Sequence, residues 1–164
     1  MSTWIGFPIN NPTLSLMADH NNKNDLHCTL VFLADTNLAG EKLDLLRSSL
    51  LDWVDNYTFP FEAELLPLEK WHGRIIVVPL KVPDWLQRAR QVLVELFKSY
   101  DIPVDPTYEW SPHITLRRDG MFPIDPRGII EITTAFLKCD DQWTYYPLGD
   151  QGNQDVINGN RSRV

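Results

Sequence analysis

The chain has 164 residues, of which 43% are hydrophobic, so it is long enough and apolar enough for one domain with a buried core. Its formal net charge of −7 argues against a long nucleic-acid groove, because such a groove needs Lys and Arg along many phosphates. A small phosphate-bearing ligand, held by one or two cations, is compatible with this balance.

The first half of the chain alternates strand patterns with one helix. Residues 3–8 (TWIGFP) are typical of a short strand, and the Asn-rich residues 9–24 of a loop. Residues 26–33 (LHCTLVFL) predict a buried strand, because apolar and β-branched residues lie between polar segments. In residues 40–56 apolar residues recur at helical spacing opposite charged ones, which predicts an amphipathic helix.

The middle of the chain predicts two strands and a second helix. Residues 58–68 and 74–81 are typical of strands, with LEKWHG as the turn between them. Pro83 and Asp84 form a helix start signal. The apolar stripe that follows consists of Trp85, Leu86, Ala89, Val92, Leu93, Leu96, Phe97 and Tyr100.

After a proline-rich loop, the rest of the chain predicts strands and a tail. Strands are expected at 113–118, 129–138 and 142–147, and the polar, Asn- and Gly-rich residues 149–164 are expected to form a mobile tail. Residues 1–148 would then form a single domain. The order of elements indicates an α+β fold of two similar antiparallel-sheet lobes with outer helices.

Cysteine usage and the terminal sequence indicate a cytoplasmic protein. Cys28 and Cys139 are too few for a disulfide framework or a zinc ribbon, and Cys28 is typical of a small buried hydrophobe. The segment MSTWIGFPIN does not have the pattern of a signal peptide, and the apolar runs are far shorter than the roughly 20 residues of a membrane span. No membrane association is expected, and the oligomeric state stays open.

Two short segments share one pattern: His27-Cys28-Thr29-Leu30 and His113-Ile114-Thr115-Leu116. Alternate residues of a strand point to one face, so each His shares a face with its Thr while the apolar residues point into a core. Arg117 falls on the same face as the second pair. Each segment could be no more than a strand surface. Two copies in strand contexts, each followed by Leu, favour a common site of two imidazoles and two hydroxyls.

On these motifs the chain resembles the 2H (two-histidine) phosphoesterase superfamily, which has two His-x-Thr/Ser motifs separated by about half a domain. That superfamily includes RNA-end cyclic phosphodiesterases, LigT-like proteins and phage anti-CBASS enzymes, which destroy cyclic oligonucleotide immune messengers. The resemblance extends over residues 1–148, although only the motifs are specific. It implies a bilobal fold with a central cleft and a hydrolase that needs no metal or other cofactor.

The residue types suit cleavage of a phosphodiester. One proton must leave the nucleophile and another must reach the leaving oxygen, and two His that titrate near neutrality can do both. Thr29, Thr115 and Arg117 would offer donors to the phosphate oxygens. By resemblance, His27 is the general acid and His113 the general base; the two motifs are nearly symmetric, so the opposite assignment stays open.

Further residues are candidates for contacts with substrate. Trp4, Trp143 and Tyr145 lie on expected strands, where they either stack on a base or pack in the core. Glu131 either orients a ribose hydroxyl or is an exposed strand carboxylate. Asp19, His20, Asp25 and His27 do not have a metal-ligand spacing that is commonly seen.

The sequence therefore predicts a metal-independent phosphodiesterase for a small nucleotide, either a 2′,3′-cyclic phosphate or a cyclic di- or trinucleotide. Three other functions stay open: an enzyme that processes RNA ends, a protein that binds or sequesters a nucleotide without catalysis, and a structural or interaction protein that uses the surface of the fold. Sequestration does not need both proton carriers, so the intact motifs favour the enzyme.

Overall fold

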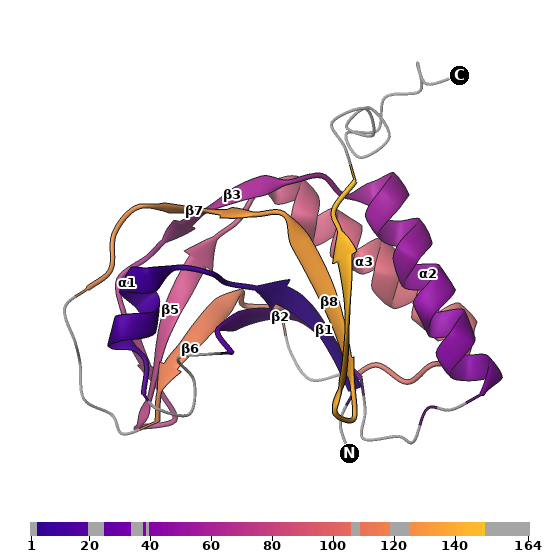
Figure 1. The fold of residues 1–164 in the computed structure, drawn as a ribbon, viewed down its shortest axis with the longest axis horizontal. Coiled ribbons are helices and arrows are strands. Elements are labelled where there is room, and N and C mark those ends of the chain that lie inside the picture. The colour runs from indigo at the N-terminus through magenta and orange to yellow at the C-terminus, as the bar shows by residue number, and fades with distance from the viewer. Residues whose placement is uncertain are drawn as a thin grey trace.

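The computed structural model describes residues 3–19, 25–33, 38, 40–105, 109–118 and 125–149. Within them nine strands form one antiparallel sheet, ordered β7-β3-β5-β6-β2-β1-β8-β9, with β4 paired to β5. Figure 1 shows a strongly curled sheet with α2 and α3 side by side and α1 at the opposite end. The elements are β1 (Thr3–Pro8), α1 (Pro12–Met17), β2 (His27–Leu33), α2 (Glu41–Tyr57), β3 (Phe61–Leu65), β4 (Glu69–Trp71), β5 (Ile75–Lys81), α3 (Asp84–Ser99), β6 (His113–Arg117), β7 (Ile129–Ile132), β8 (Thr134–Cys139) and β9 (Gln142–Pro147).

Both long helices lie where the sequence predicts them. On α2 the buried residues Leu46, Ser49, Leu50, Trp53 and Val54 follow the spacing of one helix face. The indole nitrogen of Trp53 donates to the carbonyl of Ala89 at 2.7 Å and so joins α2 to α3. In the predicted stripe of α3, however, Val92 and Tyr100 are exposed, because Val92 falls at the margin of the face that α3 buries and Tyr100 lies beyond the last helical residue, Ser99.

No helix in the described ranges is long and apolar enough to cross a membrane.

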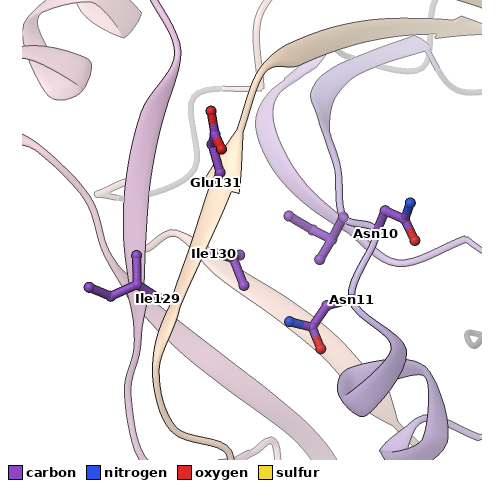
Figure 2. Close-up of a pocket in the computed structure, with 6 residues that line it drawn as sticks. Asn10, Asn11, Ile129, Ile130 and Glu131 are labelled. Atoms are coloured by element: carbon purple, nitrogen blue, oxygen red, sulfur yellow. The ribbon is translucent and has the colours of Figure 1, made fainter.

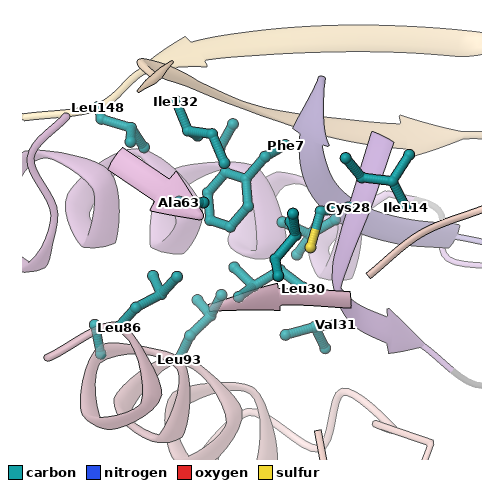
Figure 3. Packing of buried hydrophobic residues seen from close by; sticks show 14 of the residues in the cluster. Phe7, Cys28, Leu30, Val31, Ala63, Leu86, Leu93, Ile114, Ile132 and Leu148 are labelled. Atoms are coloured by element: carbon teal, nitrogen blue, oxygen red, sulfur yellow. The ribbon is translucent and has the colours of Figure 1, made fainter. Parts of the chain in front are cut away.

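The core lies on the side of the sheet that α2 and α3 cover. Figure 3 shows Leu86 and Leu93 of α3 facing strand residues that include Leu30. Cys28 and Ile114, the central residues of the two motifs, belong to this core and are 1% and 0% exposed. The expectation that Cys28 is a small buried hydrophobe is therefore confirmed. Each motif is anchored by the residue between its His and its Thr.

The opposite face of the sheet carries a second layer of side chains. On β8, Ala135 and Leu137 belong to the core, whereas Phe136 between them is fully buried outside it. Because side chains alternate along a strand, Phe136 lies on the other face. The histidines and threonines of both motifs also alternate with core residues and are half-buried. They share this second face.

The two predicted lobes are two halves of one sheet, and the α+β class is confirmed. β1 and β2 are joined by six residue pairs, whereas in the described strands β2 and β6 are joined only by Cys28 opposite Ile114. This seam separates the half β9-β8-β1-β2 from the half β6-β5-β3-β7, with β4 beside β5. The last two strands return to the half that contains β1, so that half combines both ends of the chain, whereas the half made of β3 to β7 is one continuous stretch of sequence.

Three local expectations are wrong. Residues 12–17, expected within a loop, form α1, because Asn11 accepts the amide proton of Leu14 at 3.0 Å and Pro12 occupies the first turn. Part of the expected turn LEKWHG forms β4, and the turn itself follows β4, where His72 and Gly73 have positive φ. The expected strand 129–138 is two strands, β7 and β8.

The chain changes sheet neighbours at Thr133, between β7 and β8. β7 pairs with β3, and β8 pairs with β1. The apolar and β-branched pattern continues through that position, which is why the sequence shows no sign of the break.

The expected tail lies outside the described residues except at its first position, Gly149.

Gly6 is a position where the fold excludes a side chain. It follows the register shift between Ile5 and Gly6, where Leu30 of β2 is left without a partner in β1, and a Cβ at Gly6 would lie 2.6 Å from the Cys28 carbonyl oxygen and 3.1 Å from the Phe136 ring. We predict that Gly6→Ala lowers the free energy of unfolding by about 1–3 kcal/mol, measured by urea denaturation, because backbone must move.

Gly73→Ala is the control for Gly6→Ala. It adds the same methyl group where no atom lies within 4 Å, so its cost reflects only the φ of +77°. Gly6→Ala alone should also change the near-UV circular dichroism of the nearby aromatic rings. Unchanged stability and spectrum in Gly6→Ala would contradict the close approach of β1 to Cys28.

Candidate active site

The seam brings the two motifs together. β2 and β6 run antiparallel with Cys28 opposite Ile114. Extending that register by one residue each way places His27 opposite Thr115, and Thr29 opposite His113. Each His therefore lies across from the Thr of the other motif, on the face away from the core. The predicted four-residue constellation forms from two segments that are more than 80 residues apart.

Both imidazoles are held in the same way. The Nδ1 atom of His27 lies 2.7 Å from the carbonyl oxygen of Asp25, and that of His113 lies 2.8 Å from the carbonyl oxygen of Ser111. A carbonyl only accepts, so Nδ1 carries the proton in each ring. Nε2 is then the nitrogen that takes up or releases a proton, which leaves two equivalent proton carriers in one site.

Burial lowers the pKa of both histidines from the usual value of 6.5. For His27, the carbonyl and carboxylate of Asp25 oppose this effect, while the charges of His113 and Lys138 add to it. For His113, the hydrogen bond to Ser111 opposes it. Both rings are therefore mainly neutral at pH 7, and the positive charge of one disfavours protonation of the other.

Aromatic rings extend from His27 across the first half of the sheet. The Trp4 ring lies 4.4 Å from His27, 4.9 Å from Phe136 and 5.7 Å from Trp143 between centroids. Tyr145 lies at the outer end, 6.5 Å from Phe136, and its side chain is 58% exposed. These rings, defined here as the aromatic row (Trp4, Phe136, Trp143 and Tyr145), come from β1, β8 and β9. Of the predicted substrate residues, Trp4 therefore lies against His27, Trp143 and Tyr145 continue the row away from it, and none of the three belongs to the core cluster.

A cation lies over the aromatic row. The Lys138 ammonium is 5.8 Å from the Trp4 centroid and 5.2 Å from that of Trp143. A cation over a ring face is attracted by the ring quadrupole. Sequence reasoning did not select Lys138 or Phe136. The alternation Thr134, Phe136, Lys138 along β8 could have indicated them once the strand was known to begin at Thr134.

Trp71 is a further site residue that the sequence interpretation missed. Its ring lies 4.2 Å from that of His113, and its indole nitrogen donates to Glu69 at 3.2 Å. Trp71 belongs to β4, a strand of three residues, which is too short for a period-two pattern to be recognised. Each histidine therefore has one tryptophan against it, from opposite halves of the sheet.

Arg117 is placed with the motifs, whereas Glu131 is not. Arg117 follows Thr115 on the same face of β6 and pairs with Ile76 of β5. Glu131 lies on β7, the strand at the far edge of the sheet order, and pairs with Glu62 of β3. Figure 2 shows it beside a pocket of about 240 Å³ whose other lining residues are Ile9, Asn10, Asn11, Ile129 and Ile130. No lining residue of this pocket belongs to either motif.

Among the described residues, no three His, Cys, Asp or Glu side chains cluster as a metal site. Asp25 and His27 are described, whereas His20 lies outside the described residues.

Solved structures similar to this chain include several phosphoesterases. A protein of Thermus thermophilus superposes with a TM-score of 0.65 at 16% identity, over 92% of this chain and 100% of its own. E. coli LigT complexed with 3′-AMP superposes with a TM-score of 0.59 at 20% identity, over 90% and 96%. The PDE domain of MHV ns2 superposes with a TM-score of 0.51 at 13% identity, over 91% and 89%.

No family model matches the chain, and no curated protein matches its sequence. The similarity to the solved structures is therefore one of fold.

The electrostatics of the site predict how His27 titrates. Lys138→Met removes a positive charge that lowers the pKa of His27, so that pKa should rise. We expect NMR titration midpoints below 6.5 for both His27 and His113 in the wild type, and a higher His27 midpoint in the variant.

Lys70→Met is the control, since Lys138 and not Lys70 acts on His27. A His27 midpoint that does not respond to Lys138→Met, or that responds equally to Lys70→Met, would contradict this arrangement.

Proposed function

Because the chain has the fold of LigT-type phosphoesterases, we propose that it is a 2H phosphodiesterase that hydrolyses a small cyclic nucleotide without a metal. One observation carries the proposal. In the described strands, the only residue pair that joins β2 to β6 lies at the centre of both His-x-Thr motifs, so the seam assembles one site from the two. A site with two neutral imidazoles is suited to paired proton transfer.

The proposed reaction is general acid–base hydrolysis. One His removes a proton from water as the new oxygen–phosphorus bond forms, and the other donates a proton to the leaving oxygen as its bond to phosphorus breaks. The product is a phosphate monoester. After one turnover the proton has moved from one ring to the other, and exchange with water restores the pair. We assign the acid to His27 and the base to His113, as the resemblance implies.

The lowered pKa values suit a base in the free protein, but the acid must hold a proton. An anionic phosphate between the rings favours their charged forms and so raises the pKa of each. Binding of substrate would therefore supply the protonated acid. Thr29, Thr115 and Arg117, on the same face, are the proposed donors to the non-bridging oxygens.

The aromatic row supports a base-bearing substrate. Stacking on Trp4, Trp143 and Tyr145 accommodates any nucleobase, and Trp71 offers a second ring beyond His113. LigT, which has a similar fold, has been crystallised with the mononucleotide 3′-AMP. We propose a 2′,3′-cyclic phosphate or a cyclic oligonucleotide messenger as the substrate. The net charge of −7 favours either over long RNA.

Glu131 lies with the separate pocket of Figure 2, so we do not assign it to the substrate.

The test is hydrolysis of a panel of 2′,3′-cyclic mononucleotides, cyclic dinucleotides and cyclic trinucleotides in the presence of EDTA, with products separated by chromatography. We expect turnover of at least one member by the wild type. His27→Ala and His113→Ala should each reduce kcat by at least about 100-fold, because acid–base catalysis typically contributes 10²–10⁴-fold.

His72→Asn is the matched control. It removes an imidazole from an exposed turn, where Asn tolerates the φ of 52°, and should leave kcat unchanged. Turnover lost in EDTA and restored by a divalent cation would contradict the metal-independent mechanism. No turnover of any member by folded wild type would contradict the small-nucleotide enzyme and favour RNA ends or sequestration.

We test the stacking role at Trp143 and not at Trp4. Trp143 contacts Trp4 and Phe136, whereas a change at Trp4 would also disturb His27, which it touches. We predict that Trp143→Leu raises KM for the nucleotide about 5- to 150-fold, since stacking contributes about 1–3 kcal/mol per base, with little change in kcat. Trp143→Phe keeps an aromatic ring, so its KM should stay close to the wild-type value. Steady-state kinetics on a nucleotide substrate measure KM and kcat of each variant. An equal rise of KM in Trp143→Leu and Trp143→Phe would contradict stacking.

A further inference from the structure

The seam between the motifs is held by side chains where strand pairing ends. The indole nitrogen of Trp110 donates to the carbonyl oxygen of Thr29 at 2.9 Å. The guanidinium Nε of Arg90, on α3, donates to the carbonyl oxygen of Leu30 at 2.7 Å. Leu30 is the residue that the β1–β2 register skips, so its carbonyl lies at the β-bulge. Two successive carbonyls of the first motif strand are therefore bonded by side chains.

Trp110 belongs to the segment that leads into the second motif. It lies three residues before His113, and the intervening Ser111 accepts the Nδ1 hydrogen bond of that histidine. The Pro112 carbonyl accepts the amide of Leu80, which fixes the segment on β5. One short stretch thus binds Thr29 through Trp110 and orients the His113 ring through Ser111. It is a direct link between the hydroxyl-bearing residue of one motif and the imidazole of the other.

Arg90 also contacts Trp110. Its guanidinium lies 5.5 Å from the centroid of the Trp110 ring, and burial lowers the pKa of Arg90. The planar guanidinium thus binds the Leu30 carbonyl and lies over the indole at the same time. This contact ties the seam to α3.

We propose that Trp110 is a positioning residue that sets the spacing of Thr29 and His113 across the seam. This inference rests on the two-histidine function proposed above. The described residues of β2 and β6 form no second pair beyond Cys28 and Ile114. The carbonyl of Thr29 instead accepts its hydrogen bond from the Trp110 indole. A displacement of about 1 Å at a reacting group costs up to about 100-fold in rate. The indole N–H therefore matters beyond its contribution to stability.

The experiment compares Trp110→Phe with Trp53→Phe. Each variant keeps an aromatic ring and removes one indole hydrogen bond to a backbone carbonyl, which is 2.9 Å long at Thr29 and 2.7 Å at Ala89. The Trp53 bond joins α2 to α3, and its acceptor lies on α3 and not on a motif strand, so this variant measures the structural effect of losing an indole hydrogen bond. The readouts are kcat and KM on the best substrate of the panel, and the NMR ring signals of His27 and His113 with and without inorganic phosphate.

Trp110→Phe should reduce kcat about 10- to 100-fold while KM changes less than about threefold, and should shift the His113 ring signals. Trp53→Phe should lower the melting temperature and leave both readouts as in the wild type. Equal kcat and unshifted ring signals in the two variants would overturn the proposal. If Trp110→Phe does not fold, a benzothienylalanine at 110, with sulfur in place of the N–H, makes the same test with the packing kept.

The two proposals can fail separately. If the wild type hydrolyses nothing, the proposed function fails, and the ring signals with phosphate alone decide whether Trp110 positions the site. If the wild type is active and Trp110→Phe matches Trp53→Phe, only the positioning role is lost.

Discussion

The pairing of Cys28 with Ile114 is the contact on which the site depends. Both residues are buried in the core, so the hydrophobic effect that stabilises the domain also fixes the register of the two motif strands. A shift of one residue would turn His27 and Thr29 into the core and Cys28 out of it. The Cys28 thiol, whose pKa burial raises to about 12, is an uncharged packing group and not a nucleophile. Its neighbours in β2, His27 and Thr29, remain the candidate reacting groups.

The fold also sets the protonation state of those neighbours. Each imidazole has its Nδ1 bonded to a carbonyl two residues earlier in the chain, so the same kind of local hydrogen bond orients both rings. Partial burial beside a tryptophan then makes the neutral form the stable one. In the proposed mechanism the neutral rings take up a proton when an anionic phosphate binds, and binding would then be coupled to the chemical step. This is the sense in which the seam supports a phosphodiesterase.

Much of this site could be predicted from the sequence, because a strand repeats every two residues. His27, Thr29, His113 and Thr115 follow from that period and from the apolar residues between them. Trp71 could not be found in this way, since β4 is three residues long and adjoins a turn. The separation of Glu131 from the motifs also could not be found, because the change of sheet neighbour after β7 leaves no mark in the apolar pattern. Strand partners are long-range, and a single sequence carries little information about them.

The central claim is that one phosphate is held between the two motifs, and a crystal structure with inorganic phosphate tests it most directly. We expect one phosphate with oxygens about 2.6–3.2 Å from Nε2 of both His27 and His113, and with Thr29 and Thr115 hydroxyls in contact. A single anion shared by both rings would establish that the seam is the reaction centre. A phosphate bound to one histidine alone, or bound in the pocket beside Glu131, would contradict the account.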